Sequence, residues 1–205
     1  MSFENLLAFL LASTIIEITP GPNMGYLAVV SLGEGRRAGF LTVLGIALGL
    51  ATIGTASAMG LAGIVANSPL AYEVLRWSGV AFMLYLAFDA WRSGDEEAIE
   101  HSSAAHFRRG LVTNLLNPKA AIFFLTVIPA FLPEGVENLA ANLLLVAIYV
   151  AVATIIHGGI VLLAGSLAPF LTDPERSRRI RRVLAILLAC VAIWFGFSTA
   201  NPGYA

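Results

Sequence analysis

Long apolar runs separated by short polar stretches dominate the pattern of this chain. About 20 apolar residues in a helix span roughly 30 Å of hydrocarbon, so six of the runs are long enough to cross a bilayer. They cover residues 5–32, 40–66, 69–91, 110–132, 139–167 and 183–201. The third run contains Glu73 and Arg76, which are three residues apart and can pair on one helix face. The pattern therefore predicts an all-α membrane protein with six transmembrane helices in a single polytopic domain over residues 1–205.

The composition agrees with a protein whose main solvent is lipid. Of its 205 residues, 58% are hydrophobic and 12% are charged, whereas soluble domains carry about twice that charged fraction. The segment 1–16 contains no Lys or Arg, so it lacks the positive region of a signal peptide. We expect the first apolar run to remain in the membrane as a span.

The positions of the positive charges test the number of spans and their direction. Eleven of the twelve Lys and Arg residues fall in or beside the first, third and fifth loops of the six-span arrangement, and Arg76 is the exception. Positively charged loops stay on the cytoplasmic side, so both termini are predicted to face away from the cytoplasm. Removing one span would place the charges on both sides. The arginine run 176–182 is expected to contact anionic lipid, and no nucleic-acid partner is expected.

Two of the predicted spans are interrupted by proline among polar residues. The first reads Glu-Ile-Thr-Pro-Gly-Pro-Asn over 17–23, and the fourth reads Asn-Leu-Leu-Asn-Pro-Lys over 114–119. Proline removes a backbone donor and frees carbonyls, which must then be buried in protein or line a cavity. Broken helices at matching positions of two halves are typical of transporters built from inverted repeats. The sequence predicts repeat 1 at about 1–92, a cytoplasmic loop at about 92–109 and repeat 2 at about 110–205, with broken first and fourth helices.

The residues at these breaks form the predicted site for a solute or proton. Glu17 follows Glu4 by 13 residues, about 20 Å along a helix, and Asn117 follows Arg109 by eight, about 12 Å. Both breaks are therefore expected between the bilayer midplane and the cytoplasmic side. The candidate residues are Glu17, Thr19, Pro20, Gly21, Pro22, Asn23, Asn114, Asn117, Pro118 and Lys119.

Three kinds of polar side chain at the breaks suggest different roles. Ionisable groups within a span are costly and are functional candidates by default, so Glu17 is expected to carry a coupling proton or to hold a substrate ammonium. The alternative is a neutral carboxyl hydrogen-bonded near Thr19. Lys119 could meet a substrate carboxylate or pair with Glu17, or it could extend to the headgroups. Asn23 and Asn114, like Asn117, could line the site or satisfy the freed backbone.

Other titratable residues favour structural interpretations. Asp89 lies beside aromatic and basic residues, which an interfacial position explains. His157 titrates near neutral pH and could relay protons, but a position near the inner edge of its span, with a structural role, is favoured. His101 and His106 belong to the polar loop, where a solvated linker is favoured over metal binding. Gly45 and Gly49 have GxxxG spacing, which indicates close helix packing or a homodimer interface.

Several function classes are excluded or left as alternatives. Cys190 is the only cysteine, and a membrane thiol–disulfide carrier needs two. No nucleophile or metal-ligand motif of a membrane hydrolase is present, so we expect neither an enzyme nor a cofactor. Among transport functions, an exporter of metal or other small cations is the main alternative, and a passive channel is not excluded by the sequence.

Two groups of motifs carry a resemblance to a known family. The first half has Pro-Gly-Pro-Asn at 20–23, Gly-Arg-Arg-Ala-Gly at 35–39 and Leu-Gly-Ile-Ala-Leu-Gly at 44–49. The second half has Phe-Arg-Arg-Gly-Leu at 107–111 and Asn-Leu-Leu-Asn-Pro-Lys-Ala-Ala at 114–121. In order, spacing and length the chain resembles the lysine-exporter (LysE/RhtB) type translocators. The resemblance implies export of amino acids or their derivatives across the bacterial inner membrane, driven by the proton gradient.

Overall fold

A computed structural model describes residues 2–19, 21–60, 68–92, 102–132, 139–167 and 174–198. Pro20 and His101 lie outside these ranges, and of Pro118 only the backbone is described. Within the described ranges every regular element is helical, which confirms the predicted all-α class. The helices are α1 (Phe3–Ile18), α2 (Pro22–Gly33), α3 (Gly35–Ala58), α5 (Pro69–Arg92), α6 (Ser103–Leu115), α7 (Pro118–Ala130), α8 (Leu139–Leu167) and α9 (Pro174–Ser198).

The two predicted helix breaks are present. The chain bends by 59° between α1 and α2 and by 55° between α6 and α7. Pro22 and Pro118 each stand in the first turn of the helix that follows the break, where proline costs no hydrogen bond because that N–H has no intrahelical partner. In the described part of the chain, α3 and α8 alone are long and apolar enough to cross a membrane, and each bent pair qualifies as one span. Up to four spans are thus supported, and the six-span arrangement stays a prediction.

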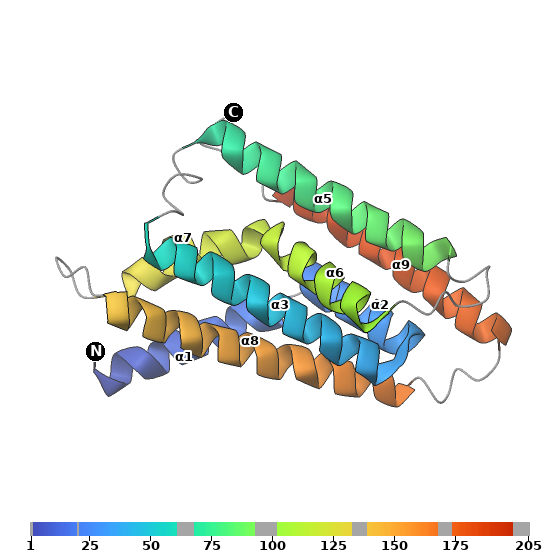
Figure 1. Cartoon of the computed structure of the whole chain (residues 1–205), viewed down its shortest axis with the longest axis horizontal. Coiled ribbons are helices and arrows are strands. Elements are labelled where there is room, and N and C mark those ends of the chain that lie inside the picture. Colours follow the sequence, from blue (N-terminus) through green and yellow to red (C-terminus); the bar gives the residue numbers. More distant parts are fainter. Residues whose placement is uncertain are drawn as a thin grey trace.

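The helices pack in two groups on either side of α2. Figure 1 shows α5 and α9 lying along each other on one side, and α1, α3 and α8 on the other. α2 contacts both α8 and α9. At the α1–α2 break, Gly21 and Pro22 on the α2 side are buried, whereas Ile18 and Thr19 at the end of α1 are exposed. α5 begins at Pro69. Within it, Arg76 forms an ion pair with Glu73 at 3.0 Å, as predicted from their spacing.

Glycines bring α3 and α6 into direct backbone contact. A Cβ atom added at Gly45 would lie 2.0 Å from the carbonyl oxygen of Phe107, and one added at Gly110 would lie 2.3 Å from that of Thr42. A Cβ at Gly49 would lie 2.9 Å from the side chain of Asn114. The predicted GxxxG motif therefore packs α3 against α6 within the chain and leaves room for Asn114.

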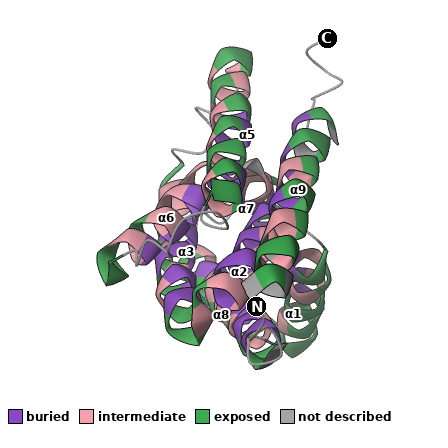
Figure 2. Cartoon of the chain, turned by 90° about the vertical axis from the view of Figure 1, so that its right-hand side faces the viewer, coloured by how far each residue is buried: buried purple, intermediate pink, exposed green. Residues whose placement is uncertain are grey.

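The buried residues gather where the helices face one another. Figure 2 shows buried positions on the facing sides of α2, α3 and α8, with exposed positions on the outer sides of the bundle. Many exposed side chains are large and apolar, as expected for a surface in contact with lipid. Examples are Leu10, Ile15, Leu44, Ile155, Leu163 and Phe197.

Candidate functional site

The two breaks contact each other through buried asparagines. Asn23, in the first turn of α2, donates a hydrogen bond from Nδ2 to Oδ1 of Asn114 near the end of α6, at 3.0 Å. Asn23 is 6% exposed and Asn114 is fully buried. Within a membrane little water is available as a hydrogen-bond partner, so polar side chains of neighbouring helices hydrogen-bond to one another. The sequence predicted both residues for one site, and the structure brings them together.

Lys119 links the second break to the first. Its Nζ donates a hydrogen bond to the carbonyl oxygen of Thr19 at 2.9 Å, and Thr19 is the C-cap residue of α1. The side chain of Asn117 accepts the backbone N–H of Lys119 at 3.0 Å and so caps α7. The cation thus binds a carbonyl freed by the opposite break. The structure therefore brings Lys119 to the opposite break, and its role in solute binding stays a prediction.

The remaining predicted residues at the first break contribute mainly through their backbone. The Thr19 hydroxyl donates to the carbonyl of Ile15 in its own helix. Gly21 is buried, and a Cβ added there would lie 3.5 Å from Cδ of Lys119. Pro22 is buried in the first turn of α2. The distance of 3.5 Å is that of ordinary van der Waals contact, so the Lys119 side chain lies directly against Gly21 at the break.

Glu17 is buried against two side chains of α8. It is 5% exposed. The Tyr149 hydroxyl donates a hydrogen bond to Oε1 of Glu17, and Nε2 of His157 lies 3.3 Å from Oε2. Tyr149 and His157 are eight residues apart, which separates them by about 80° around the axis of α8. We refer to Glu17, Tyr149 and His157 as the Glu17 triad.

Two members of the Glu17 triad were not predicted as site residues. His157 was expected to be structural and near the inner edge of its span, and Tyr149 was not singled out. The presence of two titratable side chains within one long apolar run is the signal that would have marked α8 as a candidate for the site. It does not name the partner, because Glu17 lies 132 residues from Tyr149 in sequence.

Aromatic rings fix the position of Tyr149. Its ring stacks on Phe123 with a centroid distance of 3.8 Å and an angle of 17°. The Phe124 ring meets it edge to face, with centroids 5.2 Å apart. All three rings are buried. Such packing leaves Tyr149 few orientations, so its hydroxyl is held toward Glu17.

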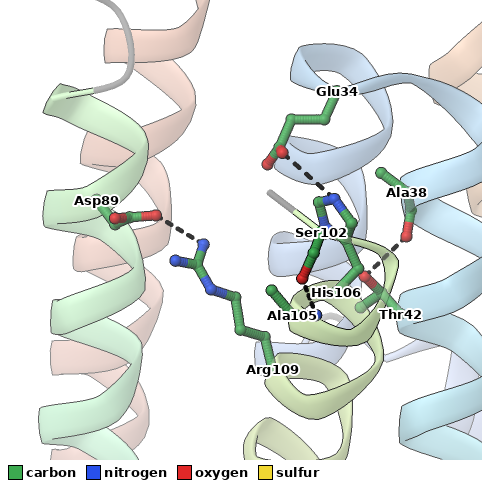
Figure 3. A network of polar contacts seen from close by, with 8 residues as sticks. All are labelled: Glu34, Ala38, Thr42, Asp89, Ser102, Ala105, His106 and Arg109. Carbon is green, nitrogen blue, oxygen red and sulfur yellow. Dashed lines mark hydrogen bonds and ion pairs between the residues drawn. The ribbon is translucent and has the colours of Figure 1, made fainter. Parts of the chain in front are cut away.

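A second polar cluster joins α5 and α6 to the turn between α2 and α3 (Figure 3). Arg109 Nη1 lies 2.7 Å from Asp89 Oδ2, and His106 Nε2 lies 3.5 Å from Glu34 Oε2. A cavity of about 20 Å³, roughly the space of one water, is lined by residues that include Tyr26, Glu34, Asp89 and Arg109. Asp89, expected to be interfacial, thus pairs with Arg109 of α6. We call Glu34, Asp89, His106 and Arg109 the four-residue cluster.

Neither cluster brings three metal-ligating side chains close together. In the part of the chain that the structure describes, no three His, Cys, Asp or Glu side chains lie close enough to hold a metal ion. The Glu17 triad contains one carboxylate, one imidazole and one phenol. These groups exchange protons and bind ammonium groups through hydrogen bonds and charge.

Comparisons with known proteins identify the class of protein and then its family. A buried polar site between two broken, apolar helices is typical of membrane transporters. The chain belongs to the LysE type translocator family, because the model of that family matches residues 14–199. It is therefore a membrane transporter and not an enzyme.

Relatives with efflux names cover nearly the whole chain. The chain is similar to a homoserine/homoserine lactone efflux protein of Salmonella typhimurium, with 27% identity over 93% of this chain and 95% of the relative. A leucine efflux protein of Klebsiella pneumoniae is 24% identical over 85% of this chain and 84% of the relative. No solved structure matches the chain. The predicted family is confirmed, and export of amino acids or related compounds is supported.

Proposed function

We propose that this protein is a secondary active exporter that moves an amino acid or amino-acid derivative across the bacterial inner membrane in exchange for protons. The efflux names of the relatives support the direction and the solute class. Homoserine, homoserine lactone and leucine share a primary amine that is charged near neutral pH. The lactone has no free carboxylate, so the ammonium is the group that a common recognition site would bind.

The packing of the helices supports two inverted halves of three spans each, repeat 1 at about 1–92 and repeat 2 at about 110–205. α3 packs against α8 and α5 packs against α9, which in a six-span arrangement pairs the second spans and the third spans of the two halves. The broken first and fourth spans meet at Asn23 and Asn114. The distribution of positive charge supports a cytoplasmic loop at about 92–109 and termini in the periplasm.

The observation that carries the proposal is the direct contact between the two breaks. Lys119 reaches the Thr19 carbonyl from a helix of the other half, and the two contacting atoms belong to residues 100 positions apart. Backbone broken within a membrane persists where it is buried in protein or lines a cavity. The proposed solute site is the space that opens when these contacts separate, with Lys119 facing a carboxylate where the solute has one and Glu17 available to an ammonium or a proton.

Transport by purified protein in vesicles tests the proposal. Radiolabelled leucine, homoserine and a panel of other amino acids are loaded, and their movement is measured with and without a pH gradient. We expect uphill movement of at least one amino acid that a protonophore abolishes. Movement that only follows the solute's own gradient would indicate a passive channel. Selective transport of divalent cations in parallel vesicles, with no amino-acid transport, would overturn the proposal in favour of a cation exporter.

Asn114→Ala and Asn23→Ala test whether the breaks form the site. Each removes one partner of the buried contact at 3.0 Å. We expect transport to fall at least tenfold while the protein stays monodisperse in detergent. Thr52→Ala is a matched control, because the Thr52 hydroxyl is exposed and bonds only the carbonyl of Leu48 in its own helix.

A further inference from the structure

Glu17 occupies a position from which its charge acts on the first break. It lies two residues before Thr19, whose carbonyl oxygen receives the Lys119 hydrogen bond. A carboxylate buried in a low-dielectric region is stable only with partners for its charge. Glu17 has such partners from two helices, α7 and α8.

Both oxygens of the Glu17 carboxyl contact side chains of α8. Tyr149 donates to Oε1, and His157 approaches Oε2 at 3.3 Å. His157 is 1% exposed, and apart from the 3.3 Å contact between Nε2 and Oε2 neither of its buried ring nitrogens has a hydrogen-bond partner among the described residues. A doubly protonated imidazole would leave an unpaired buried donor at Nδ1, which is unfavourable. With Glu17 ionised and His157 neutral, the one imidazole proton lies on Nε2, facing Oε2, and Nδ1 is an acceptor only. A further proton taken up by the pair therefore goes to the Glu17 carboxyl, which becomes a neutral carboxylic acid, rather than to Nδ1.

The charges around Glu17 limit the site to one added positive charge. The titratable and charged groups that act on it are His157 and Tyr149 from α8 and Lys119 from α7. With Glu17 ionised, Lys119 protonated, and His157 and Tyr149 neutral, the group has no net charge. Either a proton or a substrate ammonium can neutralise the Glu17 carboxylate, while the carboxylate of a zwitterionic solute would face Lys119. Both together would leave the ammonium without a negative partner in a region of low dielectric, where an unpaired charge is unfavourable.

We propose that Glu17 and His157 form one proton-binding pair, and that the proton and the ammonium of the solute compete for it. Tyr149 is a positioning residue, because it holds the Glu17 carboxyl through Oε1 while its own ring is held by Phe123. Binding of the solute releases the proton from the pair, and return of a proton displaces the solute. This inference rests on the proposed amino-acid export and assigns the exchange to named side chains.

Proton release on binding tests the pair without requiring transport. Purified protein in weakly buffered detergent solution receives leucine or homoserine, and a pH indicator records the protons released. At a pH where the pair is protonated, we expect close to one proton per bound solute for the wild type, and none for Glu17→Gln. Glu4→Gln is the matched control, since Glu4 is an exposed carboxylate on the same helix, and it should release protons as the wild type does.

The pH dependence of binding gives a second readout. Competition predicts that the apparent Kd of the wild type rises as pH falls, by up to tenfold per pH unit while the pair takes up its proton. His157→Gln should still bind solute, but with a flatter dependence on pH. Tyr149→Phe should shift the pH range of this dependence, whereas Tyr85→Phe, which alters a half-exposed ring on α5, should not. Glu17→Asp keeps a titratable carboxyl and should retain proton release, which guards against a Gln variant that does not fold.

Vesicle transport separates failure of this inference from failure of the proposed function. We expect His157→Gln to retain exchange of labelled for unlabelled leucine or homoserine at equal pH, while transport driven by a pH gradient falls at least tenfold. A His157→Gln protein with unchanged gradient-driven transport and an unchanged pH profile would overturn the pair. A wild type that binds solute without releasing protons would overturn the competition. A wild type that exchanges no amino acid at all would instead overturn the proposed export.

Discussion

The crossing of α3 and α6 makes a strong prediction about a single methyl group. Gly45→Ala adds a Cβ atom that would lie 2.0 Å from the Phe107 carbonyl oxygen. Carbon atoms rarely come within about 3 Å of such an oxygen, so the two backbones must separate by about 1 Å. Overpacking of a close-packed interior costs roughly 1 to 3 kcal/mol. For a chain of this size the midpoint of thermal unfolding should fall by roughly 2 to 12 °C.

The matched control is Gly159→Ala on α8. A Cβ added at Gly159 meets nothing within 4 Å, and alanine is favoured over glycine in a helix by roughly 0.5 to 1 kcal/mol. Its unfolding midpoint should therefore stay unchanged or rise slightly. Both variants are compared with the wild type by thermal unfolding in one detergent, followed by tryptophan fluorescence and by loss of the monodisperse chromatographic peak. If Gly45→Ala unfolds at the same temperature as Gly159→Ala, the proposed backbone contact between α3 and α6 is wrong.

Three further contacts give testable outcomes. A double-mutant cycle of Asn23→Ala and Asn114→Ala, measured by denaturant unfolding, should give a coupling of about 0.5 to 2 kcal/mol, and additive effects would contradict the hydrogen bond. Asp89→Arg and Arg109→Asp should each reduce transport, and the combined exchange should restore part of it if their 2.7 Å ion pair matters; no rescue would refute that role. Lys119→Met should weaken binding of leucine at least fivefold and affect homoserine lactone less, whereas equal effects on both solutes would exclude a carboxylate partner.

The helix breaks and the residues that join them could be predicted because their signal is local. Proline within an apolar run allows few local structures, and the polar residues beside Pro22 and Pro118 indicated that the broken ends are buried. The meeting of Asn23 with Asn114 followed from the symmetry of two halves with one break each. A solute-sized cavity between the breaks stays a prediction, as do the six spans and the direction of the termini.

The partners of Glu17 could not be derived from the sequence, because they depend on the rotation of α8 about its axis. α8 is apolar around most of its circumference, so its periodicity does not specify which side faces α1. Glu17 is joined to Tyr149 across 132 positions and to His157 across a similar separation. A pattern of single residues contains no information about such long-range pairing. Asp89 shows the same difficulty. Its aromatic and basic neighbours in the sequence suggested a position at the membrane interface and did not indicate its ion pair with Arg109.

One face of α7 connects the two chemical parts of the site. Lys119 and Phe123 are four residues apart and therefore lie on the same side of this helix. Lys119 bonds the Thr19 carbonyl at the break, and Phe123 stacks on the ring whose hydroxyl holds Glu17. A tilt of α7 must therefore displace both contacts at the same time. In the proposed exchange, solute entry and proton release would then be coordinated by the movement of one short helix.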